Sequence, residues 1–145
     1  MRFDIENQLS SAQDFTGAAT VATNSYKKQS AGQDISIGRS MSLLCRVTTA
    51  AGAGSTHTME AVETTNGTTG SLAVLATKTI LAAVLIAGYV FELVIPQSSL
   101  SLQYIGFRNT SSGGTTTVSL DVYLIPSDEF SKYKSFPRGS NVAAV

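Results

Sequence analysis

Residues of the types that most often take part in catalysis are scarce in this chain. Its 145 residues include one His, one Cys and no Trp, and 14% are charged. His57 is the single residue of the usual general-base type, and a hydrolytic triad would need a nucleophile and an orienting carboxylate around it. Nothing in the spacing of the Asp residues selects such a partner, and no Gly-x-Ser-x-Gly motif occurs. We therefore expect His57 to be a polar residue at the start of a strand, and the chain not to be an enzyme.

Metal and redox chemistry also lack a residue set in this sequence. Cys45 has no second Cys to pair with, and its apolar neighbours predict a buried thiol. Without a second His or a Cys-x-x-Cys motif, a zinc site lacks ligands. Glu60 and Glu63 are three residues apart, which places them on opposite faces of a strand. No calcium loop or phosphate-binding loop occurs, so we expect no metal and no cofactor.

The two ends of the chain carry the candidate partner-binding residues. After Pro126, aromatic side chains are interleaved with Lys and Arg, a composition typical of anchors that dock into a groove of a partner. A terminus folded back on its own sheet is an alternative, as is base stacking on a single-stranded nucleic acid. Ten cationic residues balance ten anionic ones, which disfavours nucleic acid. The candidates are Phe3, Phe130, Lys132, Tyr133, Lys134, Phe136 and Arg138.

The elements that would hold these ends are strands. Alternation of apolar and polar residues recurs along the chain, and helical periodicity is nearly absent, which predicts an all-β antiparallel sandwich or jelly roll. Asn66-Gly67 predicts a tight hairpin, and Ser111–Gly114 is expected to be the tip of a hairpin between the last two strands. The segment 81–87 could be a short helical turn. Strands are expected at 41–47, 56–63, 74–81, 89–95, 100–105 and 118–124, with an earlier one through 18–26.

These elements divide the chain into one domain with two arms. We expect an N-terminal arm over 1–15, a β-sandwich over 16–126 and a C-terminal arm over 127–145. The first residues do not resemble a secretory signal, because acidic residues come at once. The apolar run 80–91 is too short to span a bilayer, which predicts no membrane association. A net charge of zero gives little protection against self-association, so we expect a partner.

Several segments resemble, in order and spacing, a known protein family. Ala18–Ser25, then Gly32–Arg39 leading into an apolar strand, are similar to segments of the jelly-roll cement, or decoration, proteins of tailed-bacteriophage capsids, of the Bordetella-phage type. The apolar segment 80–88 followed by a strand that ends at Pro96 resembles the same family, as does 104–124. The resemblance covers about residues 12–126 and leaves the C-terminal segment without a counterpart.

Membership of that family would imply a virion protein on the outer capsid surface. Its partners would be the major capsid protein and further copies of itself, with a homodimer favoured over a homotrimer. We expect the core sheets to pair two copies and the arms to reach neighbouring shell subunits. The alternative is a carbohydrate- or receptor-binding β-sandwich module of a fibre or adhesin, since a jelly roll serves both roles.

Overall fold

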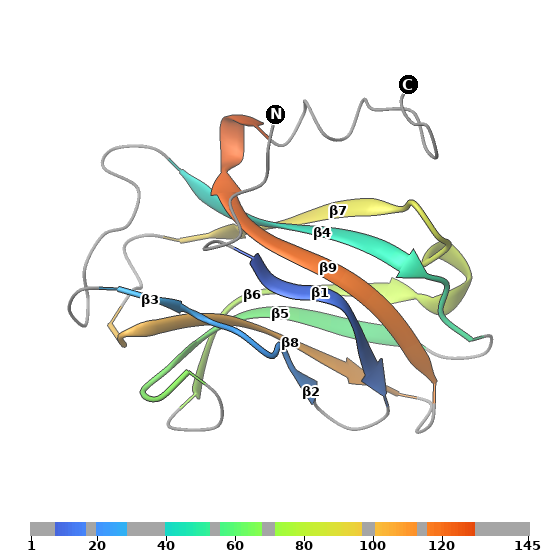
Figure 1. Ribbon diagram of the computed structural model, residues 1–145, viewed down its shortest axis with the longest axis horizontal. Helices are drawn as coiled ribbons and strands as arrows, with labels where there is room; N and C mark the ends of the chain where they lie inside the picture. The colour runs from blue at the N-terminus through green and yellow to red at the C-terminus, as the bar shows by residue number, and fades with distance from the viewer. Residues whose placement is uncertain are drawn as a thin grey trace.

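The described residues form two antiparallel β-sheets packed face to face in the computed structural model of this chain (Figure 1). They are 8–16, 20–28, 40–52, 56–67, 72–96, 101–112 and 116–129. The first sheet has the order β1 (Gln8–Thr16), β9 (Thr117–Pro126), β4 (Met41–Thr49) and β7 (Val90–Ile95). The second sheet has the order β2 (Thr20–Val21), β8 (Tyr104–Ser111), β5 (Thr56–Thr64) and β6 (Leu72–Leu81), and β3 (Tyr26–Lys27) also pairs with β8.

The pairing of the strands is nested. β1 pairs with β9, β2 and β3 with β8, β4 with β7, and β5 with β6, all antiparallel. We count β2 and β3 as one interrupted strand, the second in the chain. The first strand then pairs with the last strand, and the second strand pairs with the next to last. That order is the jelly roll, an architecture of two sheets built from two Greek keys. The expected all-β sandwich is confirmed.

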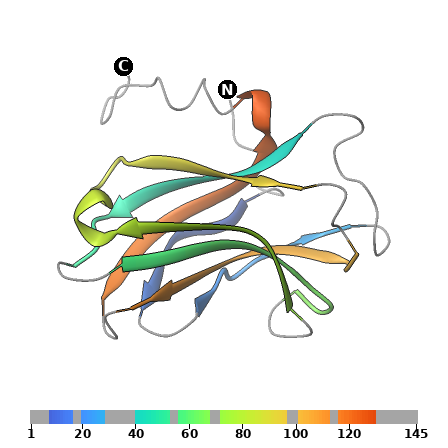
Figure 2. The same cartoon turned by 180° about the vertical axis from the view of Figure 1, so that it is seen from behind.

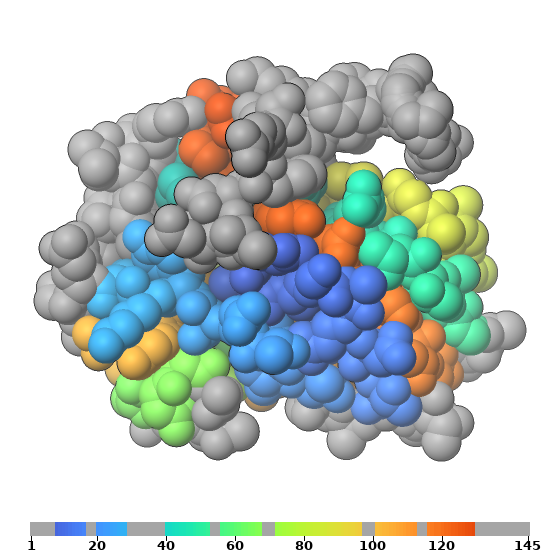
Figure 3. Space-filling model, in the orientation of Figure 1, coloured from blue at the N-terminus to red at the C-terminus, as the bar shows by residue number. Residues whose placement is uncertain are grey.

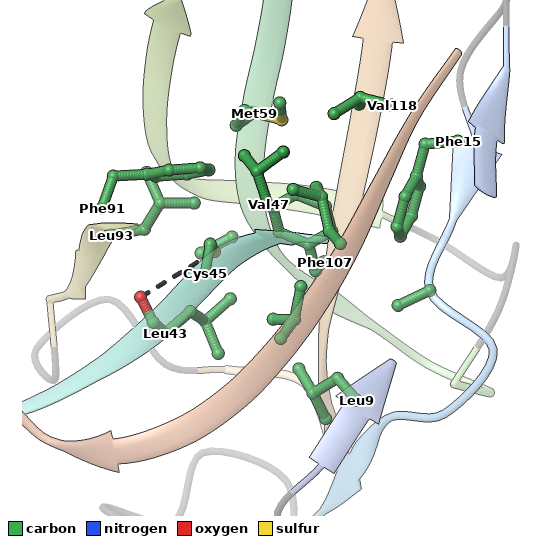
Figure 4. Close-up of a cluster of buried hydrophobic side chains, with 14 of the residues drawn as sticks. Leu9, Phe15, Leu43, Cys45, Val47, Met59, Phe91, Leu93, Phe107 and Val118 are labelled. Carbon is green, nitrogen blue, oxygen red and sulfur yellow. Dashed lines mark hydrogen bonds between the residues drawn. The ribbon is translucent and has the colours of Figure 1, made fainter. Parts of the chain in front are cut away.

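The core fills the space between the sheets with alternate residues of each strand (Figure 4). Leu43, Cys45 and Val47 point inward from β4, as their alternation predicts. Phe15 of the first sheet meets Phe107 of the second edge to face, with ring centroids 5.3 Å apart. Such aromatic pairs add to the stabilisation that burial alone provides. The inward residues of β9 are Val118, Leu120, Val122 and Leu124.

The expected N-terminal arm is too long, because residues 8–16 form β1. Leu9 and Phe15 are both buried in the core, and Gln8 pairs with Tyr123 near the end of β9. The register of β1 shifts between Gln8 and Ser10 and again before Gln13, and Ala12 has a φ of 45°. These bulges break the alternation by which a strand is recognised from sequence. In Figure 3 the three N-terminal strands form a broad part of one face.

Three other expectations need correction. No hairpin joins β8 to β9, because the two strands belong to different sheets, and of the expected tip Ser111–Gly114 only the first two residues lie within the described part of the chain. The strand expected at 100–105 begins instead at Tyr104, and its inward residues are Ile105 and Phe107. The strand expected through 18–26 consists of the two short pieces β2 and β3.

The expected turns are confirmed in part. β5 and β6 form a hairpin, and Gly67 has a φ of 85°, but β5 ends at Thr64 and β6 begins at Leu72, so the connection is longer than the tight Asn66-Gly67 turn expected. A side chain there would also collide with Ser25, since its Cβ would lie 2.6 Å from Oγ. The segment after β6 contains the 3-10 helix η2 (Ala82–Val84), and a second one, η4 (Ser127–Glu129), follows β9. Among the described residues no helix has the length and apolarity that crossing a bilayer requires.

Candidate functional site

His57 lies on the inner face of β5 and is fully buried. Its Nδ1 is 3.2 Å from Oδ1 of Asn109 on β8, and within the described part of the chain neither His57 Nε2 nor Asn109 Nδ2 has a hydrogen-bond partner. Burial lowers the pKa of His57 below 6.5, and the bond to Asn109 opposes the shift. The amide oxygen of Asn109 can accept a hydrogen bond from this imidazole, so Asn109 fixes the orientation of the ring inside the core.

A second buried polar group joins Lys28, just after β3, to Glu63 on the inner face of β5. Lys28 Nζ donates to Glu63 Oε2 over 3.0 Å, and neither side chain is exposed. The carboxylate also accepts hydrogen bonds from the backbone N–H groups of Ser101 and Leu102, at 3.0 and 3.1 Å. Buried charges persist when they are paired and hydrogen-bonded. This group therefore ties β3, β5 and the segment before β8 together at one end of the sandwich.

Two further ion pairs lie on the outer faces of the sheets. Arg46 Nη2 donates to Asp121 Oδ2 over 2.7 Å across β4 and β9, and Asp121 Oδ1 accepts from the Ala12 N–H at the bulge of β1. In the other sheet, Arg108 donates to Glu60 over 2.8 Å. Each pair joins neighbouring strands, so it helps to fix the register between them.

The structure separates the two carboxylates Glu60 and Glu63 of β5. Glu60 pairs outward with Arg108, and Glu63 pairs inward with Lys28, as expected for residues three apart on a strand. The described residues contain no group of three or more His, Cys, Asp or Glu side chains that could hold a metal ion. Cys45 is buried in the core, as its neighbours predict, and burial raises the pKa of its thiol well above the usual range.

Exposed apolar side chains are the remaining feature of the described surface that could contact a partner. The large ones all belong to the segment from β6 to β7. On the outer face of the first sheet, Leu44 and Ile125 form a second, smaller apolar group with Val90 and Tyr123 packed against it, but Leu44 and Ile125 are buried and add nothing to the exposed apolar surface. The residues concerned in the β6–β7 segment are Val74, Leu81, Val84, Ile86 and Val94.

The predicted partner-binding residues lie outside the described part of the chain. This holds for Phe3 and for the aromatic and cationic residues from Phe130 to Arg138. The described chain ends at η4, where the Ser127 N–H donates to the Ser40 carbonyl and the two hydroxyls of Ser42 and Ser127 are 2.5 Å apart. Since Ser42 alternates with the inward Leu43, the chain leaves β9 beside the outer face of the first sheet.

Sequence reasoning missed the Lys28–Glu63 pair, although one signal for it was present. Met59, Ala61 and Glu63 share a face of the strand, and that face enters the core. A carboxylate at an inward position needs a buried partner. The sequence does not identify Lys28 as the partner of Glu63, because Lys28 is 35 residues away and lies at the end of a two-residue strand.

No protein-family model matches the sequence, and no curated protein matches it. The likeness to decoration proteins therefore stays a prediction that depends on the segments quoted above. What the geometry of the described residues offers is a sandwich with one buried ion pair, two ion pairs on its outer faces, and exposed apolar side chains at one end.

Proposed function

We propose that this chain is a capsid decoration protein, which binds the outer surface of an assembled bacteriophage shell and stabilises it. The observation that carries the proposal is the nested strand order of the jelly roll, since that is the fold that the resemblance implies. The partner is the major capsid protein, and the place of action is the virion, after synthesis in the bacterial cytoplasm. No cofactor or catalytic step enters this function.

Stabilisation follows from selective binding. A protein that binds the assembled shell and not the free subunits stabilises the shell by about 2.7 kcal/mol per site at a hundred times its dissociation constant. Repeated over a lattice, such increments resist internal pressure. The buried Lys28–Glu63 pair and the outer pairs of Arg46 and Arg108 support this role, because they fix strands of each sheet to one another. A rigid body loses less entropy when it docks.

The predicted contact residues are those of the chain ends. Aromatic rings supply most of the energy of such contacts, and cations choose the orientation of the partner. We therefore assign Phe130, Tyr133 and Phe136 to affinity, and Lys132, Lys134 and Arg138 to steering. Phe3 is the matching anchor of the N-terminal end. The two groups of residues can be separated experimentally, because salt weakens steering far more than apolar contact.

The test is binding of the purified chain to undecorated, expanded capsids, with unassembled major capsid protein as the reference. We expect tight binding to capsids and weak binding to free subunits. Replacing Phe130, Tyr133 and Phe136 by Ser should abolish binding, whereas replacing Lys132, Lys134 and Arg138 by Gln should slow association and reduce its salt dependence. Absence of capsid binding by the unmodified chain would refute the function, and unchanged affinity of both variants would exclude the C-terminal end.

A glycan array distinguishes capsid decoration from the alternative function, carbohydrate or receptor binding. A sugar-binding module would retain specific glycans at micromolar concentration, whereas a decoration protein would retain none. Clear glycan binding without capsid binding would favour the carbohydrate- or receptor-binding module.

A further inference from the structure

The outer face of the first sheet is shielded from solvent around the middle of β4. In an antiparallel sheet with one face on the core, the other face is normally solvated. On this face, however, Ser42, Leu44 and Ile125 are exposed to only 0%, 2% and 6% of their surface. They belong to β4 and β9, the two central strands of the sheet, and Leu44 and Ile125 form one apolar cluster. This part of the face must therefore have a cover.

The described part of the chain accounts for one end of this cover. η4 lies beyond the face, at the ends of β9 and β4 (Figure 2). There the Ser127 N–H donates to the Ser40 carbonyl, and the hydroxyls of Ser127 and Ser42 are 2.5 Å apart. These contacts explain the burial of Ser42. They do not explain the burial of Leu44, which lies two residues further along β4, roughly 7 Å away.

A buried carboxylate oxygen lies beside the covered residues. Glu92 of β7 is directly opposite Leu44 of β4, so the two side chains share the outer face. Oε2 of Glu92 is buried, and within the described part of the chain it has no hydrogen-bond partner. Arg46, on the same face of β4, donates instead to Asp121 of β9. A buried carboxylate needs a cation or a hydrogen-bond donor, so we expect the cover to supply one.

The sixteen residues that follow Glu129 have the composition that this face requires. They include three cationic residues, no anionic residue and three aromatic residues. The cations complement Glu92, and aromatic rings complement the apolar pair of Leu44 and Ile125. Residues 1–7, which lead into β1, carry two acidic residues and one basic residue, so they lack this complementarity. The residues concerned after Glu129 are Phe130, Lys132, Tyr133, Lys134, Phe136 and Arg138.

The described chain ends at a point from which the following residues can reach the covered area. β9 ends at Pro126, opposite Met41 at the start of β4. A chain that turns back through η4 therefore runs over β4 towards Leu44. From Ser42 to Leu44 and across to β7 the path is roughly 12 Å, which about four extended residues span. The two lysines of the segment are three and five residues beyond Glu129, so both come within range of β7.

We infer that residues 130–145 pack on the outer face of the first sheet of their own chain, over β4, with Lys132 or Lys134 paired with Glu92. The covered area ends within β7, where Val94 is 51% exposed. The inference deepens the proposed function and rests on it in one respect, because the residues assigned to the capsid are then occupied in the free protein. A shell must displace them from the sheet. The apparent affinity for capsids is reduced in proportion to the fraction of molecules with a released segment.

The experiment is paramagnetic relaxation enhancement in the full chain, without capsids. Ser135→Cys introduces a thiol for a nitroxide label at a residue that is assigned no contact, and the native Cys45 is buried. We expect the amide signals of Leu44 and Glu92 to lose most of their intensity. The signal of Thr58, on the outer face of the other sheet, should lose far less.

A charge variant tests the pairing with Glu92. Glu92→Gln in the labelled chain should restore much of the intensity lost at Leu44, because the segment is held less tightly. Glu60→Gln is the matched control, since it removes the same charge from the outer face of the second sheet, and it should restore none. Thermal unfolding of each variant shows whether the fold is retained, and the labelled chain without a charge variant is a sufficient test if one of them unfolds.

Dilution and mixing identify the chain that supplies the segment. The expected loss is unchanged on dilution and absent when a labelled chain is mixed with an unlabelled reporter chain. Three results would overturn the inference: no selective loss at Leu44, a loss that occurs only between different copies, or a loss caused by a label at Glu6→Cys and not by the label at Ser135→Cys.

Capsid binding by the unlabelled chain is measured separately. A segment that packs on its own sheet in a protein that does not bind capsids would refute the proposed function and support this inference. A protein that decorates capsids but shows no loss at Leu44 would refute this inference and leave the proposed function standing.

Discussion

Lys28 and Glu63 form an ion pair of 3.0 Å in which neither side chain has any exposure to solvent. Removing two charges from water costs several kcal/mol, and their attraction offsets this only when the remaining polar atoms are satisfied. Glu63 meets that condition through the N–H groups of Ser101 and Leu102. The pair therefore holds together the segments that carry its two residues. Removing one residue of the pair leaves the charge of the other buried without a counter-charge.

Substitution on one side of this pair should be more harmful than substitution on both. Lys28→Met leaves the Glu63 carboxylate buried without its cation, at a cost of about 3–5 kcal/mol of unfolding free energy. Adding Glu63→Gln removes the charge and keeps an oxygen for the backbone N–H groups, so the double variant should recover part of the loss. Urea unfolding measures both values. A double variant less stable than Lys28→Met would contradict this account.

Stability should fall in mild acid because of His57. Its folded pKa is lower than the unfolded value of 6.5, so the unfolded chain binds the proton first as pH drops. The contribution of His57 is complete above pH 6.5 and is lost as pH falls through the folded pKa, with a slope of at most about 1.4 kcal/mol per pH unit. Urea midpoints from neutral to mildly acidic pH should show this slope, and His57→Gln should lack it. Equal slopes for the two proteins would assign the acid sensitivity to carboxylates.

Asp121 should matter more than its partner Arg46. The carboxylate is nearly buried and also accepts the Ala12 N–H over 2.7 Å, whereas the Arg46 side chain is 52% exposed. Asp121→Ala leaves that N–H without its acceptor and should cost about 1–3 kcal/mol. Arg46→Gln should cost less than about 1 kcal/mol, as exposed ion pairs do. Hydrogen exchange at Ala12 should accelerate in the first variant and not in the second.

Phe15 should prove to be a core residue rather than part of a terminal arm. Its ring contacts Phe107 of the opposite sheet, and both are fully buried. Phe15→Ala and Phe107→Ala should each cost about 3–5 kcal/mol. The double variant should cost less than the sum, since the contact can be lost only once. Strictly additive values from thermal or urea unfolding would show that the rings do not interact.

The Cys45 thiol should be inert in the native protein. It is fully buried, and burial raises its pKa well above the usual range, with the charge of Lys78 opposing the shift only in part. The thiolate is the reactive form, so a thiol reagent at neutral pH should label the protein only as fast as it opens. Labelling in denaturant provides the reference rate. Rapid labelling of the folded protein would contradict the placement of Cys45 in the core.

The strands that sequence predicts well are those with one fully apolar face. The apolar face of β4 and of β9 alternates regularly, so their inward residues follow from the pattern, and each strand extends only one or two residues beyond the expected bounds. β1 could not be recognised, because its polar residues and two register shifts hide the alternation of Leu9 and Phe15. β8 was placed out of phase because its inner face carries Asn109 and Ser111 besides Ile105 and Phe107. Polar inward residues look like outward ones when only the sequence is read.

The connections were harder to predict than the strands. Ser111–Gly114 has the composition of a hairpin tip, but β8 and β9 belong to different sheets, and only the tertiary packing of the two strands decides against a hairpin. A short helical turn was one interpretation of the segment 81–87, and a 3-10 helix forms at Ala82–Val84, but the sequence did not indicate that Leu81 and Ile86 are exposed. Which side of a 3-10 turn faces water depends on the anchors Ala82 and Leu85, and their burial is a property of the folded chain.

The pairing of Gln8 with Tyr123 has a mechanical consequence. The first and last long strands run antiparallel side by side, so both leave the sandwich at the same end. Tension applied through the two ends of the chain would peel β1 from β9 one hydrogen bond at a time, which needs little force. Compression across the faces meets the whole packed interior at once. The protein therefore resists a load that is applied across its faces, but it unfolds strand by strand when force is applied to the ends of the chain.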